Sequence, residues 1–413
     1  MCRPLPTAMS GFAHVFTSRS FWFFKKMSLF NVPPRLTPAV RVTTYYFVHS
    51  MSVGVINAFV GIWFAHKGIT PEQIGFITSA PLIVLLFIGV AVGRVADQAP
   101  DWRPVIVVGA VISGVLPLGL FFAEGYVGIL IVWTVCVVSQ MAILPVVDAA
   151  SIRLGRRVGF EFSHLYAWKT IGYMLTIFVA GFAIAEIGIT AFVPIFVGLS
   201  LLRAATAFGL PRFRETREAL KASRHTDSLR DVLRPWFLFP LLGWALVHST
   251  HFVLNGFLGL LWHERGIAES TIGLLIVVGS VAELGMFVGF KWFAGRITPR
   301  VLIVASCLVA VVRWTAFAFS PSVPILFGLQ LLQALTYALG FLACTHFIAD
   351  VTDESIAAQA QSFFGILQSG IAILALVSFG WLAAMFGAYA FLASASLAAL
   401  GALLVVISMT LKK

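Results

Sequence analysis

The chain has 413 residues, of which 60% are hydrophobic and only 11% are charged, and its mean hydropathy is +0.97. Soluble domains carry about 25% charged residues, so this composition excludes a soluble protein and predicts a polytopic membrane protein. The net charge is +11, but the Lys and Arg residues fall between apolar runs and form no contiguous basic face, which argues against a nucleic-acid partner. Long apolar runs indicate membrane helices and not barrel strands, because a helix satisfies its own backbone hydrogen bonds in lipid.

The first 38 residues contain five Lys or Arg residues and no Asp or Glu. The short apolar run at 21–24 is too brief for the core of a signal peptide. We therefore expect residues 1–38 to be a cytosolic N-terminal tail. Translation from Met27 in place of Met1 would also leave an ordinary short leader.

Twelve apolar runs follow, each long enough for a membrane helix of about 20 residues. A polar stretch between the sixth and seventh runs predicts a cytosolic loop at 211–235, which divides the chain into a six-helix half at 39–210 and a second half at 236–413. The runs lie at roughly 40–63, 72–93, 104–122, 126–149, 165–186, 189–209, 236–262, 270–293, 300–319, 324–349, 357–383 and 388–410.

The charges between the runs predict the orientation of the chain. With the N-terminus in the cytoplasm, the outer loops hold only Lys67 and Arg265 as basic residues. That asymmetry follows the positive-inside rule and places both termini in the cytoplasm, with the protein in a bacterial inner membrane. One inner loop, with Asp350, Asp353 and Glu354, is acidic. The inner loops hold Arg94, Arg103, Arg153, Arg156, Arg157, Arg296 and Arg300.

The two halves repeat each other. Seven residues of the first half recur in the second at a constant offset of 198, within a nineteen-residue window. A repeat unit of six spans keeps the same orientation in both halves, and two parallel six-helix repeats joined by a polar loop describe the major facilitator fold. The alternative is two unrelated helical bundles of similar composition. The recurring residues are Asn57, Phe59, Gly61, Gly68, Ile69, Ile74 and Gly75, which return as Asn255, Phe257, Gly259, Gly266, Ile267, Ile272 and Gly273.

Two charged residues fall well inside apolar runs, Glu283 in the eighth and Arg313 in the ninth. An ionisable group in the hydrocarbon layer costs at least about 2.5–3.5 kcal/mol, so such groups face a polar cavity or each other. We expect a polar site here, and the alternative is a structural ion pair that joins two helices. The cysteines have no metal-ligand spacing, and two histidines alone make a weak site, so neither a metal nor a cofactor is predicted.

Three local patterns carry a resemblance to a known family. The segments VAELGMFVGF and LVAVVRW contain Glu283 and Arg313, LPVVDAASIRLGRRVGFEFSHLYAWKTIGY contains Asp148 and Tyr173, and STHFVLNGF contains His251. Over its whole length the chain resembles the major facilitator superfamily, and more narrowly the branch of lactose permease and the 3-phenylpropionate transporter-like family. This resemblance implies substrate contacts at Asp148, Tyr173, His251 and Arg313, and proton coupling through Glu283 with Arg313.

The chain departs from that branch at two positions. Tyr166 stands where an arginine is usual in the fifth span, and Gln333 stands where a histidine is frequent in the tenth. Lys169 shares a helix face with Tyr166 and is the candidate for the missing positive charge, paired with Asp148; the alternative is that Lys169 extends to the membrane surface.

Asn57 and Asn255 occupy equivalent positions in the first and seventh spans. Each is a candidate substrate contact or a helix-packing group.

These observations predict a monomeric, twelve-span secondary transporter that moves a small organic solute by alternating access. Proton symport of an aromatic or other organic carboxylate is the favoured function. A sugar or nucleoside symporter and a drug exporter are alternatives. A membrane-embedded enzyme or sensor is the alternative from another class, but the sequence shows no nucleophile motif and no phosphate-binding glycine loop, so we expect no enzymatic activity.

Overall fold

The computed structural model describes residues 37–159, 162–213, 234–292, 295–351 and 354–411. Nearly all of the expected cytosolic tail at 1–38 and most of the expected loop at 211–235 lie outside these ranges, as do Asp353 and Lys413.

The described residues form helices and short connections, with no strand among them. Eleven stretches are long and apolar enough to cross a membrane, and the last of them, Phe363–Thr410, contains two helices, so the predicted twelve spans are confirmed. The α-helices are α2 (Pro38–His66), α3 (Pro71–Gln98), α4 (Trp102–Val115), α5 (Gly125–Val158), α6 (Phe162–Ile187), α7 (Phe192–Phe208), α8 (Pro235–Glu264), α9 (Glu269–Gly289), α10 (Pro299–Ala318), α11 (Val323–Leu331), α12 (Gly340–Val351), α13 (Glu354–Phe386) and α14 (Phe391–Thr410).

Short helical turns complete several spans. A π-helix, η4 (Ala334–Leu339), joins α11 and α12 into the tenth span. The 3-10 turns are η1 (Leu116–Phe121), η2 (Ile189–Ala191), η3 (Phe290–Trp292) and η5 (Gly387–Ala390).

The recurring glycines have a structural reason in the turns after α2 and α8. Gly68 and Gly266 adopt left-handed conformations with φ of 76° and 75°. A residue with a side chain is strained there, whereas glycine ends the helix without cost. The next helix α3 then begins at a capping box in which Thr70 and Gln73 satisfy each other's backbone N–H groups. The internal repeat therefore reflects equivalent helix ends in the two halves as well as identical residues.

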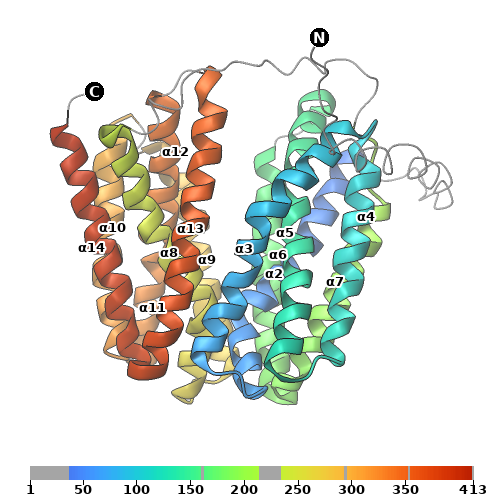
Figure 1. Ribbon diagram of the computed structural model, residues 1–413, viewed down its shortest axis with the longest axis horizontal. Coiled ribbons are helices and arrows are strands. Elements are labelled where there is room, and N and C mark those ends of the chain that lie inside the picture. The colour runs from blue at the N-terminus through green and yellow to red at the C-terminus, as the bar shows by residue number, and fades with distance from the viewer. Residues whose placement is uncertain (1–36, 160–161, 214–233, 293–294, 352–353, 412–413) are drawn as a thin grey trace, which may run out of the picture.

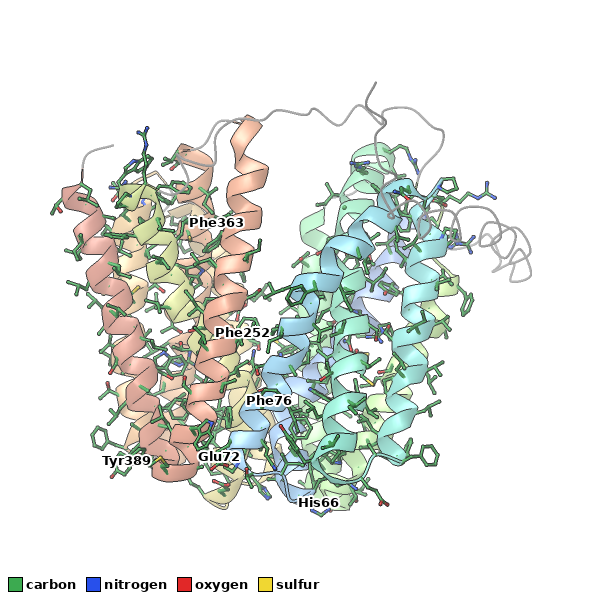
Figure 2. All side chains as sticks on the ribbon, viewed as in Figure 1. His66, Glu72, Phe76, Phe252, Phe363 and Tyr389 are labelled. Atoms are coloured by element: carbon green, nitrogen blue, oxygen red, sulfur yellow. The ribbon has the colours of Figure 1, made fainter. Side chains whose placement is uncertain are left out.

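The helices form two bundles that stand side by side, α2–α7 in one and α8–α14 in the other (Figure 1). His66, at the end of α2, lies at the same end of the molecule as Tyr389, which precedes α14, while Phe363 lies at the opposite end (Figure 2). Helix α2 ends at His66, and α14 begins just after Tyr389. The start of α2 and the end of α14 therefore lie at the opposite end of the molecule, which we name the termini end. One hydrophobic core runs through both bundles and contains, for example, Phe59 and Phe257, while a second core lies within the first bundle alone.

Far from the termini end, the two bundles touch backbone to backbone at six glycines, which we name the glycine seam. A Cβ atom at Gly61 would lie 2.6 Å from the carbonyl oxygen of Gly256, and one at Gly380 would lie 2.6 Å from that of Pro71, whereas ordinary contact begins at 3.4 Å. The seam joins α2 to α8, α3 to α13 and α6 to α9. Its members are Gly61, Gly75, Gly181, Gly259, Gly273 and Gly380.

Candidate functional site

A cavity of about 490 Å³ lies between the two bundles. Phe252, one of its lining residues, is near mid-height in Figure 2. The wall is formed by α2 and α6 of the first bundle and by α8, α9, α11, η4 and α12 of the second. Six of the residues predicted from the sequence line it, namely Asn57, Lys169, Tyr173, His251, Asn255 and Glu283. The other two, Asp148 and Arg313, are not among its lining residues.

Arg313 is fully buried behind the cavity wall and binds neutral oxygen atoms. Its Nη1 donates to Oε1 of Gln333 at 2.5 Å and to Oγ1 of Thr336 at 2.9 Å. Its Nη2 donates to Oε1 of Gln330 at 2.5 Å, and its guanidinium lies 4.9 Å from the ring centre of Trp314. These contacts hold the buried cation in place without a carboxylate beside it.

Glu283 reaches Arg313 only through Gln333. Within the described part of the chain the two charged groups form no direct ion pair, so the pairing considered from the sequence is replaced by a bridged arrangement. Because a guanidinium can only donate, the oxygen of the Gln333 amide must face Arg313, and its NH₂ group faces Glu283. That Nε2 atom donates to Oε2 of Glu283 at 3.5 Å.

The π-helix η4 supplies the remaining acceptors of this network. The carbonyl oxygen of Thr336 accepts from Nε2 of His251 and from Oγ of Ser306, both at 3.2 Å. A π-turn changes the i→i−4 pattern of the helix and occurs frequently at functional sites. Within the described ranges, the Nδ1 atom of His251 has no hydrogen-bond partner. The fixed ring of His251 therefore presents one unused nitrogen, on a residue that lines the cavity.

In the first bundle, Asp148 on α5 is held by two phenols. Its Oδ1 accepts from the hydroxyl of Tyr46 at 2.5 Å, and its Oδ2 accepts from that of Tyr166 at 3.4 Å. The ammonium of Lys169 lies 4.6 Å from the ring centre of Tyr166. Among the residues described here, Asp148 and Lys169 form no direct ion pair; Tyr166 contacts both of them.

The second bundle also contributes an aromatic wall made of His248, Phe252, Tyr337 and Phe341. Tyr337 stacks on Phe341 with an interplanar angle of 5° and on His248 with one of 27°, and Phe252 meets His248 edge to face. All four residues line the cavity. The sequence analysis did not single out Phe252, Tyr337 or Phe341, because aromatic residues are frequent throughout the chain and no local pattern marks those that face inward.

On the opposite wall, Nδ2 of Asn57 donates to the hydroxyl of Tyr173 at 3.5 Å. Asn255, its counterpart in the repeat, is exposed on α8 and also lines the cavity. The two asparagines thus place amide groups on both sides of the same space.

Comparison with known proteins identifies this architecture. The model of the MFS_1-like family matches residues 39–393. The chain belongs to the major facilitator superfamily. As a member of this superfamily it is a secondary transporter of a small organic solute and not an enzyme.

The relatives of this chain are named for different substrates. A probable 3-phenylpropionic acid transporter of Escherichia coli is 25% identical over 350 residues, which cover 82% of this chain and 89% of that protein. The maltose permease of Geobacillus stearothermophilus is 23% identical and covers 84% of this chain and 86% of its own length. The crystal structure of the nucleoside transporter NupG, at 15% identity, covers 91% of this chain and all of that one with a TM-score of 0.79. In this superfamily the substrate site lies between the two halves of the transporter, and the cavity likewise lies between the two bundles.

Proposed function

We propose that this transporter is a proton symporter for a small organic monoanion, with an aromatic carboxylate as the favoured cargo. The observation that carries the proposal is the charge on the cavity wall. Among the described residues that line the cavity, Lys169 is the one Lys or Arg and Glu283 is the one Asp or Glu. They lie on opposite bundles, on α6 and α9. An ammonium group in a low-dielectric site attracts a carboxylate far more strongly than it does in water.

The aromatic wall supports a cargo with an apolar ring. Stacked and edge-to-face aromatic contacts favour ring centroids 4.5–7 Å apart, and an arene placed against Tyr337 and Phe252 would extend the stack already present. The carboxylate at Lys169 and the ring at this wall would occupy opposite bundles. The printed name of the Escherichia coli relative, a 3-phenylpropionic acid transporter, fits this division.

A neutral, hydroxylated solute is the second candidate. The amides of Asn57, Asn255 and Gln330 line the same cavity, and amides suit the hydroxyl groups of a sugar or nucleoside. The maltose permease among the relatives favours this reading.

Transport by this mechanism needs the cavity to face each side of the membrane in turn. Glu283 would take up a proton and Lys169 the carboxylate while the cavity faces the side of loading. The bundles would then rock about the site, with the glycine seam closing as the termini end opens. A proton on Glu283 removes its charge, which lowers the cost of passing through a closed, dry intermediate.

The expected location is the inner membrane, with both termini in the cytoplasm. Arg103, Arg157 and Arg300 support this orientation, because they bond to the backbone of Phe208, Arg212 and Ser408 at the termini end. Lys67 and Arg265 lie at the opposite end, in the turns after α2 and α8. The positive-inside rule then puts the termini end in the cytoplasm and the glycine seam on the periplasmic side.

The test is proton flux into proteoliposomes on addition of 3-phenylpropionate, its amide 3-phenylpropanamide, maltose or xanthosine. We expect the carboxylate alone to cause external alkalinisation. Glu283→Gln should abolish net proton-coupled uptake but keep exchange of solute, and Lys169→Gln should raise KM for the carboxylate at least about tenfold. Lys67→Gln, on the exposed turn after α2, is the matched control and should behave like wild type. Alkalinisation by maltose or xanthosine without the carboxylate would contradict the proposal.

A further inference from the structure

The same arrangement occurs on both sides of the cavity, where a neutral side chain stands between a half-buried acid and a base. Tyr166 separates Asp148 from Lys169 in the first bundle, and Gln333 separates Glu283 from Arg313 in the second. Both are positions at which the sequence departs from the branch that it resembles.

We name Tyr166 and Gln333 the spacers, because each stands between an acid and a base. In the first bundle, the spacer Tyr166 contacts Asp148 and Lys169 through different parts of its side chain. The Tyr166 hydroxyl donates to Asp148, which also accepts from Tyr46. The face of the same Tyr166 ring holds the ammonium of Lys169. A cation over an aromatic face keeps its N–H donors, so Lys169 is positioned and still able to bind an anion.

In the second bundle, the spacer satisfies the base and leaves the acid on the wall. Gln333, Gln330 and Thr336 give the Arg313 guanidinium three oxygen acceptors. Among the described residues, Glu283 receives one side-chain hydrogen bond, the long one from Nε2 of Gln333. The carboxyl group that lines the cavity is thus not neutralised by the cation behind it.

We infer that Tyr166 and Gln333 reserve one unpaired positive charge and one unpaired negative charge for the cavity, so that each monoanion crosses with one proton and the cycle moves no net charge. This inference rests on the proposed function and deepens it.

The charge balance gives the reason. With all four groups ionised, Asp148 and Glu283 cancel Lys169 and Arg313, and the site is neutral. A proton on Glu283 leaves one surplus positive charge, which one bound carboxylate cancels. Two carboxylates, or one without a proton, would leave a net charge in a low-dielectric site, which is costly. Arg203 is buried in the first bundle, where it donates hydrogen bonds to Ser52 and Ser113. Its charge stays the same throughout the cycle, so it does not enter this charge balance.

Groups on every neighbouring element face Glu283. Lys169 and Tyr173 on α6, His248 and His251 on α8 and Tyr337 on η4 line the same cavity as Glu283, and Arg313 on α10 is buried behind its wall. His251 is bound to the carbonyl of Thr336, and His248 is stacked on Tyr337. Lys169 is the one cationic side chain of this set that lines the cavity, so the carboxylate of the cargo and the proton of Glu283 are the charges that change during transport.

The first experiment tests whether the pH gradient or the membrane potential drives transport. Proteoliposomes with wild-type protein, potassium and valinomycin are given either gradient alone, and accumulation of 3-phenylpropionate is measured. We expect accumulation with the pH gradient and none with the potential. One net charge moved through about 100 mV would change the accumulation ratio by roughly 50-fold. A potential-driven change of that size would overturn the inference while leaving carboxylate symport intact, whereas absence of carboxylate transport would overturn both.

The second experiment removes the Tyr166 spacer. In Tyr166→Leu, Asp148 loses a donor and Lys169 loses its ring, so the two should pair directly and KM for 3-phenylpropionate should rise about tenfold or more with little change in kcat. The double variant Tyr166→Leu/Asp148→Asn removes the competing acid and should restore a low KM. A merely structural role for Tyr166 predicts no such rescue, and a double variant as weak as the single one would overturn the spacer role. Tyr166→Phe, which keeps the ring, should fall between wild type and Tyr166→Leu.

Discussion

A single methyl group at Gly75 should shift this transporter toward the state in which the glycine seam is open. In the structure, a Cβ atom on Gly75 would lie 2.5 Å from the carbonyl oxygen of Leu376 and 3.3 Å from Cα of Gly380. Ordinary contact begins at 3.4 Å, so α3 and α13 would have to move apart by about 0.9 Å. The atoms in the way belong to backbone, and no side-chain rotation can relieve the clash.

The size of the effect follows from the cost of overpacking, which is typically about 1–3 kcal/mol. In the open-seam state α3 and α13 are separated near Gly75, so the added methyl group meets no backbone and adds no free-energy cost. The whole penalty therefore falls on the closed-seam state, and the equilibrium between the two states should shift by roughly 5- to 150-fold. Net transport should slow, because the carrier then returns to the closed-seam state less often.

Spin labels at Lys67 and Tyr389, both exposed at the seam end, would report this shift as a longer distance between the bundles in pulsed electron resonance. Gly89→Ala is the matched control, because it lies on the same helix α3 and its new Cβ would have nothing within 4 Å. Identical distance distributions for Gly75→Ala and Gly89→Ala would refute the reasoning that these backbones limit closure.

Three further predictions concern stability and are checked by thermal unfolding of the detergent-solubilised protein. Arg313→Met removes the donor that three buried oxygen atoms share and should lower stability by about 3 kcal/mol; an unchanged unfolding temperature would show that those oxygens find other partners. Gly340→Ala places a Cβ on the ring of Trp244 and should cost about 1–3 kcal/mol, whereas Gly328→Ala, with open space around it, should cost less than about 1 kcal/mol. Thr70→Ala removes the capping box of α3 and should cost about 1 kcal/mol, and a loss near zero would indicate that Gln73 caps alone.

The architecture could be read from the sequence because lipid leaves few alternatives. Apolar runs of about 20 residues must become helices in a membrane, and a repeat of an even number of spans must be parallel. The same argument identified Glu283 and Arg313 as members of one polar site, since a charge inside a span needs a polar partner.

The partners of those charges could not be read in the same way. Whether Arg313 meets Glu283 or Gln333 depends on how each helix is rotated about its axis, which sequence spacing does not determine. The π-turn of η4 adds to this difficulty, because it breaks the 3.6-residue periodicity on which predictions of a shared face depend. Asp148 was likewise assigned to the substrate side, but the phenols of Tyr46 and Tyr166 hold it behind the cavity wall.

The residue numbers of the glycine seam show one difference between the two halves. Gly61 and Gly75 correspond to Gly259 and Gly273 at an offset of 198 residues. Gly181 and Gly380 play equivalent parts, since one faces the first residue of α9 and the other the first residue of α3, but their offset is 199. The second half therefore has one residue more than the first between its equivalents of Gly75 and Gly181, that is, between Gly273 and Gly380. The two halves thus keep equivalent contacts at the glycine seam although the second half is one residue longer across this interval.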